Sequence, residues 1–459
     1  MTRRVVVVGA DAAGMSAAHQ ALRAARRAGR ELEVVAFEAT QHTSYSACGL
    51  PYWIAGRVGS GDALVARTAA EHVAAGIDLR MGTRVTALDL DARTVTAEGP
   101  GGVEEVAYDD LVLATGAEPV LPDWARDDDG AVLPGAGPVK TMDDGRAWLD
   151  RFDDEDGDVL VVGGGYIGLE MVEAVLARGR GCTLLTRSRF MHVLDPDMGQ
   201  RVVGALRRAG AVVREDSEVT GLDVDRGRVC GARTSGESVS ANLVVLALGL
   251  APRTGLVAGH LPLGKHDGML PDARGRVDAA RGVWAAGDCC EVEHRLLREP
   301  RFLPLGTHAN KHGRALGDNL GDPSSPLSFD GALGTAITRF EAGGEYLEIA
   351  MTGLIEEVAT EAGLDVVAAT LEGTTSSGYM PEAEPIAVRV VAERGTRRLL
   401  GVQVVGGHGA GKRVDTAAAV LWHGGTVDDL AWMDLSYAPP FATAWEVLQV
   451  AARRVSERL

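Results

Sequence analysis

The chain has 459 residues, of which 46% are hydrophobic and 24% charged, and its formal net charge is −18. This length predicts about three domains, the composition is that of a globular protein, and the acidic excess argues against nucleic acid as a partner. No apolar run approaches the roughly 18 residues that a membrane helix needs, and residues 5–8 are too short a run for a secretory signal. We therefore expect a cytoplasmic, multi-domain protein with no membrane partner.

The first motif in the chain is a strand, a turn, a helix and a second strand, at residues 4–8, 9–14, 15–28 and 32–37. This order predicts a dinucleotide-binding βαβ unit, in which the turn lets the backbone approach a pyrophosphate at the helix N-terminus. Asp11 takes the place of the second glycine, so its carboxylate must turn away from the phosphates or cap the helix. The residues expected to bind the cofactor are Gly9, Asp11, Ala12, Ala13, Gly14 and, on the ribose hydroxyls, Glu38.

A second unit of the same kind follows, with strands at 158–162 and 182–185 and a helix at 169–178. Its turn carries all three glycines, and the candidate cofactor ligands are Gly163, Gly165, Tyr166, Ile167 and Gly168. No acidic residue follows its second strand. Arg187 and Arg189 stand there instead, and guanidinium groups pair well with a 2′-phosphate unless they are merely solvated. The unit is therefore expected to bind NADPH in preference to NADH.

Three more segments fit this scheme. The segments 108–114 and 243–248 are each predicted to be a buried strand closed by glycine, a pattern that also fits any buried strand. They add Ala114, Thr115, Gly116 and Gly249 to the candidate ligands. The run 284–288 is more specific because it ends in Gly287 and Asp288. A carboxylate at this place either contacts the ribityl chain of a flavin or caps the following helix, and the two roles are compatible.

In this order, the motifs resemble those of the pyridine nucleotide-disulfide oxidoreductases over nearly the whole chain. The resemblance implies an α/β fold with two Rossmann-like dinucleotide-binding domains plus a C-terminal α+β dimerisation domain. It implies that FAD binds to residues 1–118 and 246–326, that NAD(P)H binds to 119–245, and that residues 327–459 make a homodimer.

The loop around Cys48 decides the subgroup. Members with two redox cysteines space them as CxxxxC, whereas this chain has Trp53 at the second position. The loop resembles that of the single-cysteine branch, which includes coenzyme A-disulfide reductases, NADH oxidases and NADH peroxidases. The oxidases and peroxidases that resemble this chain usually carry a histidine where Ala12 stands, and this difference favours the coenzyme A-disulfide reductases.

Further residues follow only from this resemblance. It implies that Tyr437 reaches the cysteine of the partner subunit as a proton donor and that Tyr379 is a second tyrosine of the same site. It implies that Arg23 and Arg67 hold the nucleotide of coenzyme A.

The expected activity is reduction of coenzyme A disulfide, or of a related small disulfide or persulfide, by NAD(P)H through FAD and a mixed disulfide on Cys48. Disulfide exchange requires a thiolate, and a helix start at residues 49–52 together with the flavin is expected to lower the pKa of this thiol. The alternatives are an NADH oxidase and an electron-transfer reductase with a protein partner. The resting state of Cys48 is left open among thiolate, sulfenate and coenzyme A mixed disulfide.

The remaining cysteines and histidines receive structural roles or none. Cys182 and Cys230 are expected to fill the core, and Cys289 and Cys290 to pack at a helix start, with a strained redox disulfide as the alternative. The histidines show no metal-ligand spacing, so no metal is expected. His308 is expected in the helix near the flavin, without an assigned role.

Overall fold

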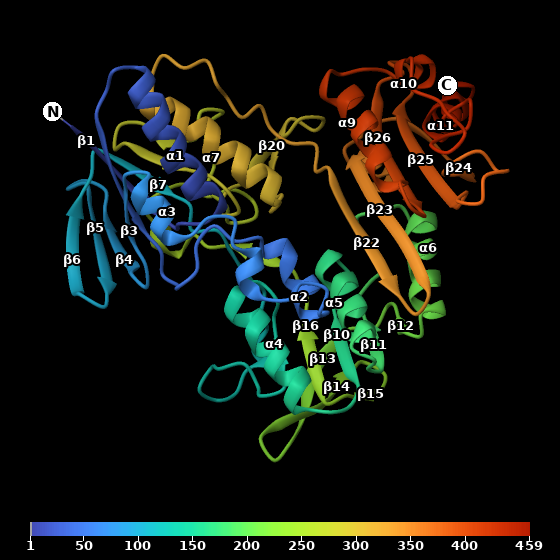
Figure 1. Ribbon diagram of the computed structural model, residues 1–459, viewed down its shortest axis with the longest axis horizontal. Coiled ribbons are helices and arrows are strands. Elements are labelled where there is room, and N and C mark those ends of the chain that lie inside the picture. The colour runs from blue at the N-terminus through green and yellow to red at the C-terminus, as the bar shows by residue number, and fades with distance from the viewer. Residues whose placement is uncertain (1) are drawn as a thin grey trace.

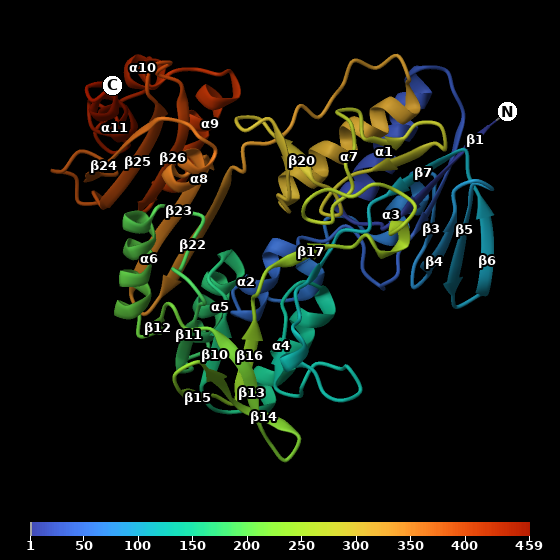
Figure 2. The same cartoon turned by 180° about the vertical axis from the view of Figure 1, so that it is seen from behind.

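The computed structural model describes residues 2–459, which form three large sheets with their own helices (Figures 1 and 2). The first sheet has the strand order β18-β19-β7-β1-β2-β3, and all its pairs are parallel except β18 with β19. Helices α1 and α7 lie side by side against it. The elements are β1 (Arg3–Val8), α1 (Ala12–Arg27), β2 (Leu32–Phe37), β3 (Ile77–Arg80), β7 (Asp110–Leu113), β18 (Arg276–Asp278), β19 (Val283–Ala285) and α7 (Gly306–Gly321).

The second sheet has the order β12-β11-β10-β16-β9 and is parallel throughout. Strands β10 and β16 are apolar at every position, as is typical of parallel strands covered on both faces. The elements are β9 (Ala136–Gly137), α4 (Met142–Asp154), β10 (Val159–Val162), α5 (Tyr166–Ala177), β11 (Cys182–Leu185), α6 (Pro196–Arg208), β12 (Val212–Arg214) and β16 (Leu243–Leu246).

The C-terminal sheet is antiparallel, with the order β22-β23-β26-β25-β24. Helices α9 and α11 pack on it, and α11 also packs on α10. The elements are β22 (Ala336–Ala342), β23 (Glu345–Gly353), α8 (Glu356–Glu361), β24 (Val366–Thr374), β25 (Pro385–Glu393), β26 (Leu399–Gly406), α9 (Val414–Trp422), α10 (Val427–Trp432) and α11 (Val447–Ser456).

Smaller elements connect these sheets. The chain passes between the first and second sheets through two strands that pair antiparallel, β8 and β17, so both crossings lie together. Two three-stranded meanders and one hairpin extend the framework. The elements are α2 (Leu50–Ile54), α3 (Ala69–Ala74), β4 (Arg84–Asp89), β5 (Thr94–Gly99), β6 (Gly102–Ala107), β8 (Ala117–Pro119), β13 (Val219–Asp225), β14 (Arg228–Thr234), β15 (Ser238–Ser240), β17 (Leu250–Pro252), β20 (Val292–His294) and β21 (Glu299–Arg301).

Helices α1 and α7 are in backbone contact. A Cβ added to Gly313, Gly317 or Gly321 of α7 would lie 2.2, 2.2 and 2.3 Å from the carbonyl oxygens of Ala13, Ala17 and Ala21 of α1. The contact pairs advance together along both helices, so the helices are parallel and their N-termini lie at the same end. Only glycine on one helix and alanine on the other allow this approach.

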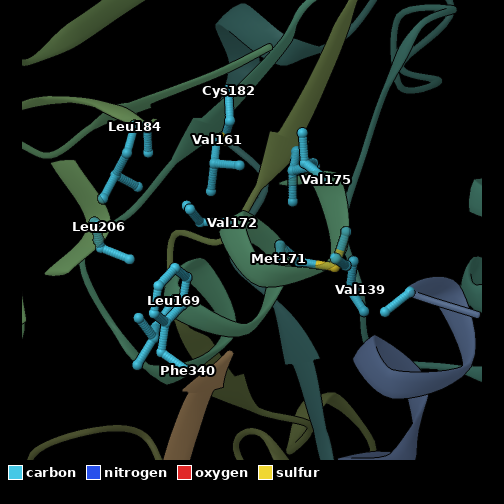
Figure 3. Close-up of a cluster of buried hydrophobic side chains, with 14 of the residues drawn as sticks. Val139, Val161, Leu169, Met171, Val172, Val175, Cys182, Leu184, Leu206 and Phe340 are labelled. Carbon is cyan, nitrogen blue, oxygen red and sulfur yellow. The ribbon is translucent and has the colours of Figure 1, made fainter. Parts of the chain in front are cut away.

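One apolar core joins the parts of the chain around α2. It contains Leu50 and Ile54 of α2, Leu169 of α5, and Phe340 of β22 in the C-terminal part. Figure 3 shows Phe340 beside Leu169, in the same cluster as Cys182. The segment after Cys48 is therefore packed against both the second and the C-terminal sheets.

The predicted elements agree with the structure in position, and the main difference is at the helix starts. The strands expected at 32–37 and 182–185 have those bounds, whereas both nucleotide helices begin three residues before the predicted starts, at Ala12 and Tyr166. The residues after each glycine turn are already helical. None of the helices within residues 2–459 has both the length and the hydropathy of a membrane span.

Two expectations for the cysteines are wrong. Cys230 is exposed on β14, because β14 alternates between a buried and a solvent face, whereas Cys182 is buried as expected. Cys289 and Cys290 are both buried, but they lie in the turn after β19 rather than at a helix start, since α7 begins only at Gly306.

The α1–α7 contact predicts that alanine at Gly317 destabilises the protein, whereas alanine at a helical glycine outside the contact does not. Gly317→Ala should lower the thermal unfolding midpoint by roughly 5 °C, because overpacking costs about 1–3 kcal/mol where the neighbour is backbone. Gly204→Ala is the matched control, since its Cβ would meet only the end of the Arg208 side chain at 3.4 Å and alanine favours a helix. Differential scanning calorimetry compares the two variants; equal midpoints would contradict the proposed close packing.

Candidate functional site

The two glycine turns have the same construction. Gly9 has φ +99°, and a Cβ added to it would lie 2.2 Å from the carbonyl oxygen of Ala114, just after the neighbouring strand. Gly163 has φ +131°, and its Cβ would lie 2.0 Å from the carbonyl oxygen of Ala247. Both turns therefore sit where the order of their sheet reverses, which is the usual ligand site of such sheets. Gly165 has no atom within 4 Å of an added Cβ, so the turn offers open backbone to a ligand. The geometry fits a pyrophosphate at each helix N-terminus.

Two acidic residues lie at the first glycine turn, Asp11 within it and Glu38 just after β2. Glu38 accepts hydrogen bonds from the backbone N–H groups of Ala10, at 3.0 Å, and Thr40, at 2.9 Å. Asp11 does not cap α1, and its buried Oδ1 has no hydrogen-bond partner. Burial, and next the charge of Glu38, raise the pKa of Asp11 to about 6. Asp11 is thus a buried acid near Glu38 that does not act as a helix cap.

Asp288 lies where the first and second sheets meet. Gly287, with φ +89°, packs against Ala13 of α1, and Asp288 accepts a hydrogen bond from Lys140 Nζ at 3.2 Å. The N-terminus of α1 and the second turn of α7 lie beside this strand end, since Gly287 also lies near Ala309. Lys140 has no signal in the sequence, because it precedes α4 and carries no motif of its own.

Cys48 lies in a single 3-10 turn, residues 47–49, directly before α2, and its side chain is exposed. Although the residue is accessible, the groups around the sulfur partly desolvate it, and this desolvation and the charge of Glu170 raise the pKa of its thiol, whereas Lys140 acts in the opposite direction. The expectation that the helix start would lower this pKa is therefore not met by the protein alone. The turn and α2 are short, so desolvation outweighs the helix dipole.

Glu170 is a second residue that the sequence analysis missed. It lies one turn after Tyr166 on α5, and its Oε1 accepts a hydrogen bond from Thr338 of β22 at 2.9 Å. Burial raises its pKa to about 7, and the buried hydroxyl of Tyr166 has no partner. The only sequence signal would have been an acid four residues after the glycine-turn tyrosine, on the same helix face.

The two candidate tyrosines come together. Tyr379 is 75% exposed and Tyr437 is 50% exposed. Their loops are joined because Ser377 donates its backbone N–H to Pro439 at 2.9 Å. Figures 1 and 2 show the loop between β24 and β25 at the outer edge of the molecule, far from α2 of the same chain. Contact with a cysteine therefore requires a second copy of the chain.

Arg23, Arg67 and Arg314 form a basic cluster, named so below. They come from α1, the segment before α3, and α7, and all three are exposed. Within residues 2–459 none of them has a carboxylate partner, and burial together with Arg314 and Arg67 lowers the pKa of Arg23. Arg314 had no motif in the sequence; it joins the cluster because α7 packs along α1.

The two arginines after β11 are not equivalent. Arg187 is exposed and makes no ion pair within the described part of the chain. Arg189 pairs with Glu357 of α8 at 2.6 Å between Nη2 and Oε2. Arg187 is the one that is available to a ligand.

Comparison with known proteins assigns the N-terminal and the C-terminal parts of the chain to the same family. The family model described as pyridine nucleotide-disulphide oxidoreductase matches residues 3–313, and its dimerisation domain matches residues 345–448. A relative from Pyrococcus horikoshii, an NAD(P)H coenzyme A polysulfide/persulfide reductase, is 34% identical, with 99% of this chain and 98% of the relative covered.

Two solved structures have the same architecture over the whole chain. An NAD-dependent persulfide reductase from A. fulgidus has a TM-score of 0.91 at 29% identity, covering 99% of this chain and 83% of its own. An engineered water-forming NADPH oxidase has a TM-score of 0.91 at 25% identity, covering 99% and 98%. The chain thus belongs to the pyridine nucleotide-disulphide oxidoreductase family and is an NAD(P)H-dependent flavoprotein oxidoreductase.

Proposed function

We propose that the protein uses NADPH to reduce coenzyme A disulfide, or a related small disulfide or persulfide, through a mixed disulfide on Cys48. The basic cluster carries this proposal, because three arginines without carboxylate partners suit the phosphates of a nucleotide-bearing thiol. The coenzyme A polysulfide/persulfide reductase activity of the Pyrococcus horikoshii relative supports it.

Each of the three large sheets would belong to a part of the chain with its own role. Residues 1–118 and 246–326 would hold FAD through the first glycine turn, Glu38 and Asp288, and residues 119–245 would hold the nicotinamide nucleotide. Residues 327–459 would form a homodimer, supported by exposed aromatic side chains in this part of the chain. They are Tyr379, Trp422, Trp432, Tyr437, Phe441 and Trp445.

Reduction of one disulfide to two thiols needs a hydride, which carries the electron pair, and one further proton. When bound, FAD would supply the chemistry that takes the hydride from the nicotinamide and passes the electron pair on. The Cys48 thiolate attacks the substrate disulfide, so that one thiolate leaves and a mixed disulfide forms. Reduction of that mixed disulfide releases the second thiol, and Tyr437 of the partner subunit would protonate a leaving sulfur. Lys140 stabilises the thiolate by its charge.

The proposed substrate predicts that loss of an arginine from the basic cluster weakens the binding of coenzyme A disulfide selectively. Arg23→Ala should raise KM for coenzyme A disulfide about tenfold or more, since a hydrogen bond to a charged group contributes about 1.5–3 kcal/mol. KM for pantethine, a disulfide without the nucleotide, should not change. The measurement is NADPH oxidation under nitrogen, with Arg84→Ala as a control arginine on β4.

Two results would contradict the assignment. One is an equal effect of Arg23→Ala on both disulfides. The other is NADPH oxidation that depends on oxygen and not on any disulfide, which would assign the protein to oxidases such as the water-forming structural neighbour.

The nucleotide preference rests on Arg187. The engineered neighbour that binds NADPH carries alanine, arginine and serine as replacements at three consecutive positions. Here Arg187 and Ser188 follow Thr186 after β11, with no carboxylate to oppose a 2′-phosphate.

Arg187→Ala should lower kcat/KM for NADPH about tenfold or more and leave that for NADH nearly unchanged. Arg189→Ala is the comparison variant, because Arg189 is already paired with Glu357 and its loss should matter less. Steady-state kinetics with both nucleotides test this prediction. An equal loss of kcat/KM for NADPH and NADH would show that Arg187 does not bind the 2′-phosphate.

A further inference from the structure

Two histidines connect the basic cluster to the Cys48 loop. Arg67 Nη1 lies 2.9 Å from His19 Nε2. His19 Nε2 also lies 2.8 Å from His72 Nδ1. His72 Nε2 in turn lies 3.0 Å from Ser44 Oγ, four residues before Cys48. Ser44 has φ +46°, a left-handed conformation that the surroundings must hold in place.

The donors fix the direction of these hydrogen bonds. A guanidinium can only donate, so Nε2 of His19 accepts and His19 is neutral with its proton on Nδ1. His72 must then donate through Nδ1 and accept from the Ser44 hydroxyl through Nε2. One lone pair of His19 therefore serves two donors, Arg67 and His72, and protonation of that nitrogen would break both contacts.

The charges around the pair oppose its protonation. Burial, and next Arg67, His72 and Arg23, lower the pKa of His19 to about 4, and burial and Arg67 lower the pKa of His72. The carboxylates on the adjoining helices have other partners: Glu71 accepts from Thr68, and Asp318 from Arg27 and Gln20. The charged groups that act on the pair are Arg23, Arg67 and Glu71. Arg27 and Arg314 act in turn on Arg23.

We infer that His19 is a proton-coupled positioning residue for Arg67: it holds the guanidinium while no phosphate is bound, and takes up a proton as Arg67 turns to a bound phosphate. This inference rests on the proposed function, since it assumes that the basic cluster binds the phosphates of the substrate nucleotide. The phosphate dianion reverses the local field, so the charged form of His19 becomes favourable. Ligand binding is then linked to proton uptake.

Proton uptake by His19 determines how the affinity for the phosphate changes with pH. His19 is neutral in the free protein above about pH 4, whereas a bound phosphate raises its pKa. Between these two values, binding takes up a proton and the affinity increases as the pH falls. The phosphates of the ligand also titrate in this range, so the effect must be read as a difference between wild type and a variant.

The test uses the full-length FAD-loaded protein and adenosine 3′,5′-bisphosphate, which contains the phosphate groups without the thiol. Isothermal titration calorimetry in two buffers of different ionisation enthalpy gives the number of protons taken up. His19→Gln keeps an acceptor for Arg67 but cannot be protonated. The ratio of wild-type to H19Q affinity should increase several-fold from about pH 8 to about pH 6, with lower proton uptake by H19Q.

Two further variants make the result specific. His72→Gln should retain the extra proton uptake, because His19 is still present, and His260→Gln, an exposed histidine elsewhere, should behave as wild type. Equal proton uptake by wild type and H19Q overturns the role of His19 while leaving the substrate assignment intact. Absence of any binding by the wild type at every pH overturns both.

Discussion

The backbone contact between α1 and α7 is the constraint on which the rest of the site depends. Gly313, Gly317 and Gly321 allow the helices to run parallel in contact, and α1 begins beside Gly287 and opposite Gly313 of α7. The positive end of the α1 dipole therefore favours an anion at this place. The same contact brings Arg314 of α7 beside Arg23 of α1. A single packing arrangement thus builds both the dinucleotide end and the basic cluster.

The environment of Cys48 is assembled from three distant parts of the sequence. Its own helix, α2, is packed in a core with α5 and β22, and Thr338 of β22 holds Glu170 of α5 near the thiol. The protein alone raises the pKa of this thiol through burial and Glu170. Lys140 opposes this rise without cancelling it, so activation must come from the groups that bind in the site. A cysteine that is less reactive in the empty site is protected from unproductive oxidation.

The sequence predicted those parts of the protein that local chemistry determines. The glycine turns, the strands 32–37 and 182–185, and the exposed cysteine without a second thiol were all readable because each depends on a few consecutive residues. Lys140, Glu170 and Arg314 were not, because each reaches the site through contacts between sheets or helices. Cys230 was misjudged for a related reason, since the exposed face of β14 depends on how its meander packs.

The central claim is that Cys48 exchanges thiols with a small disulfide. Intact-mass and peptide mass spectrometry after anaerobic treatment with coenzyme A disulfide test it directly, with Cys230→Ser as the control for the other exposed cysteine. The account predicts one coenzyme A adduct per chain, located at Cys48, lost on addition of NADPH and absent from Cys48→Ser. An unmodified Cys48, or NADPH-dependent disulfide reduction that persists in Cys48→Ser, would contradict it.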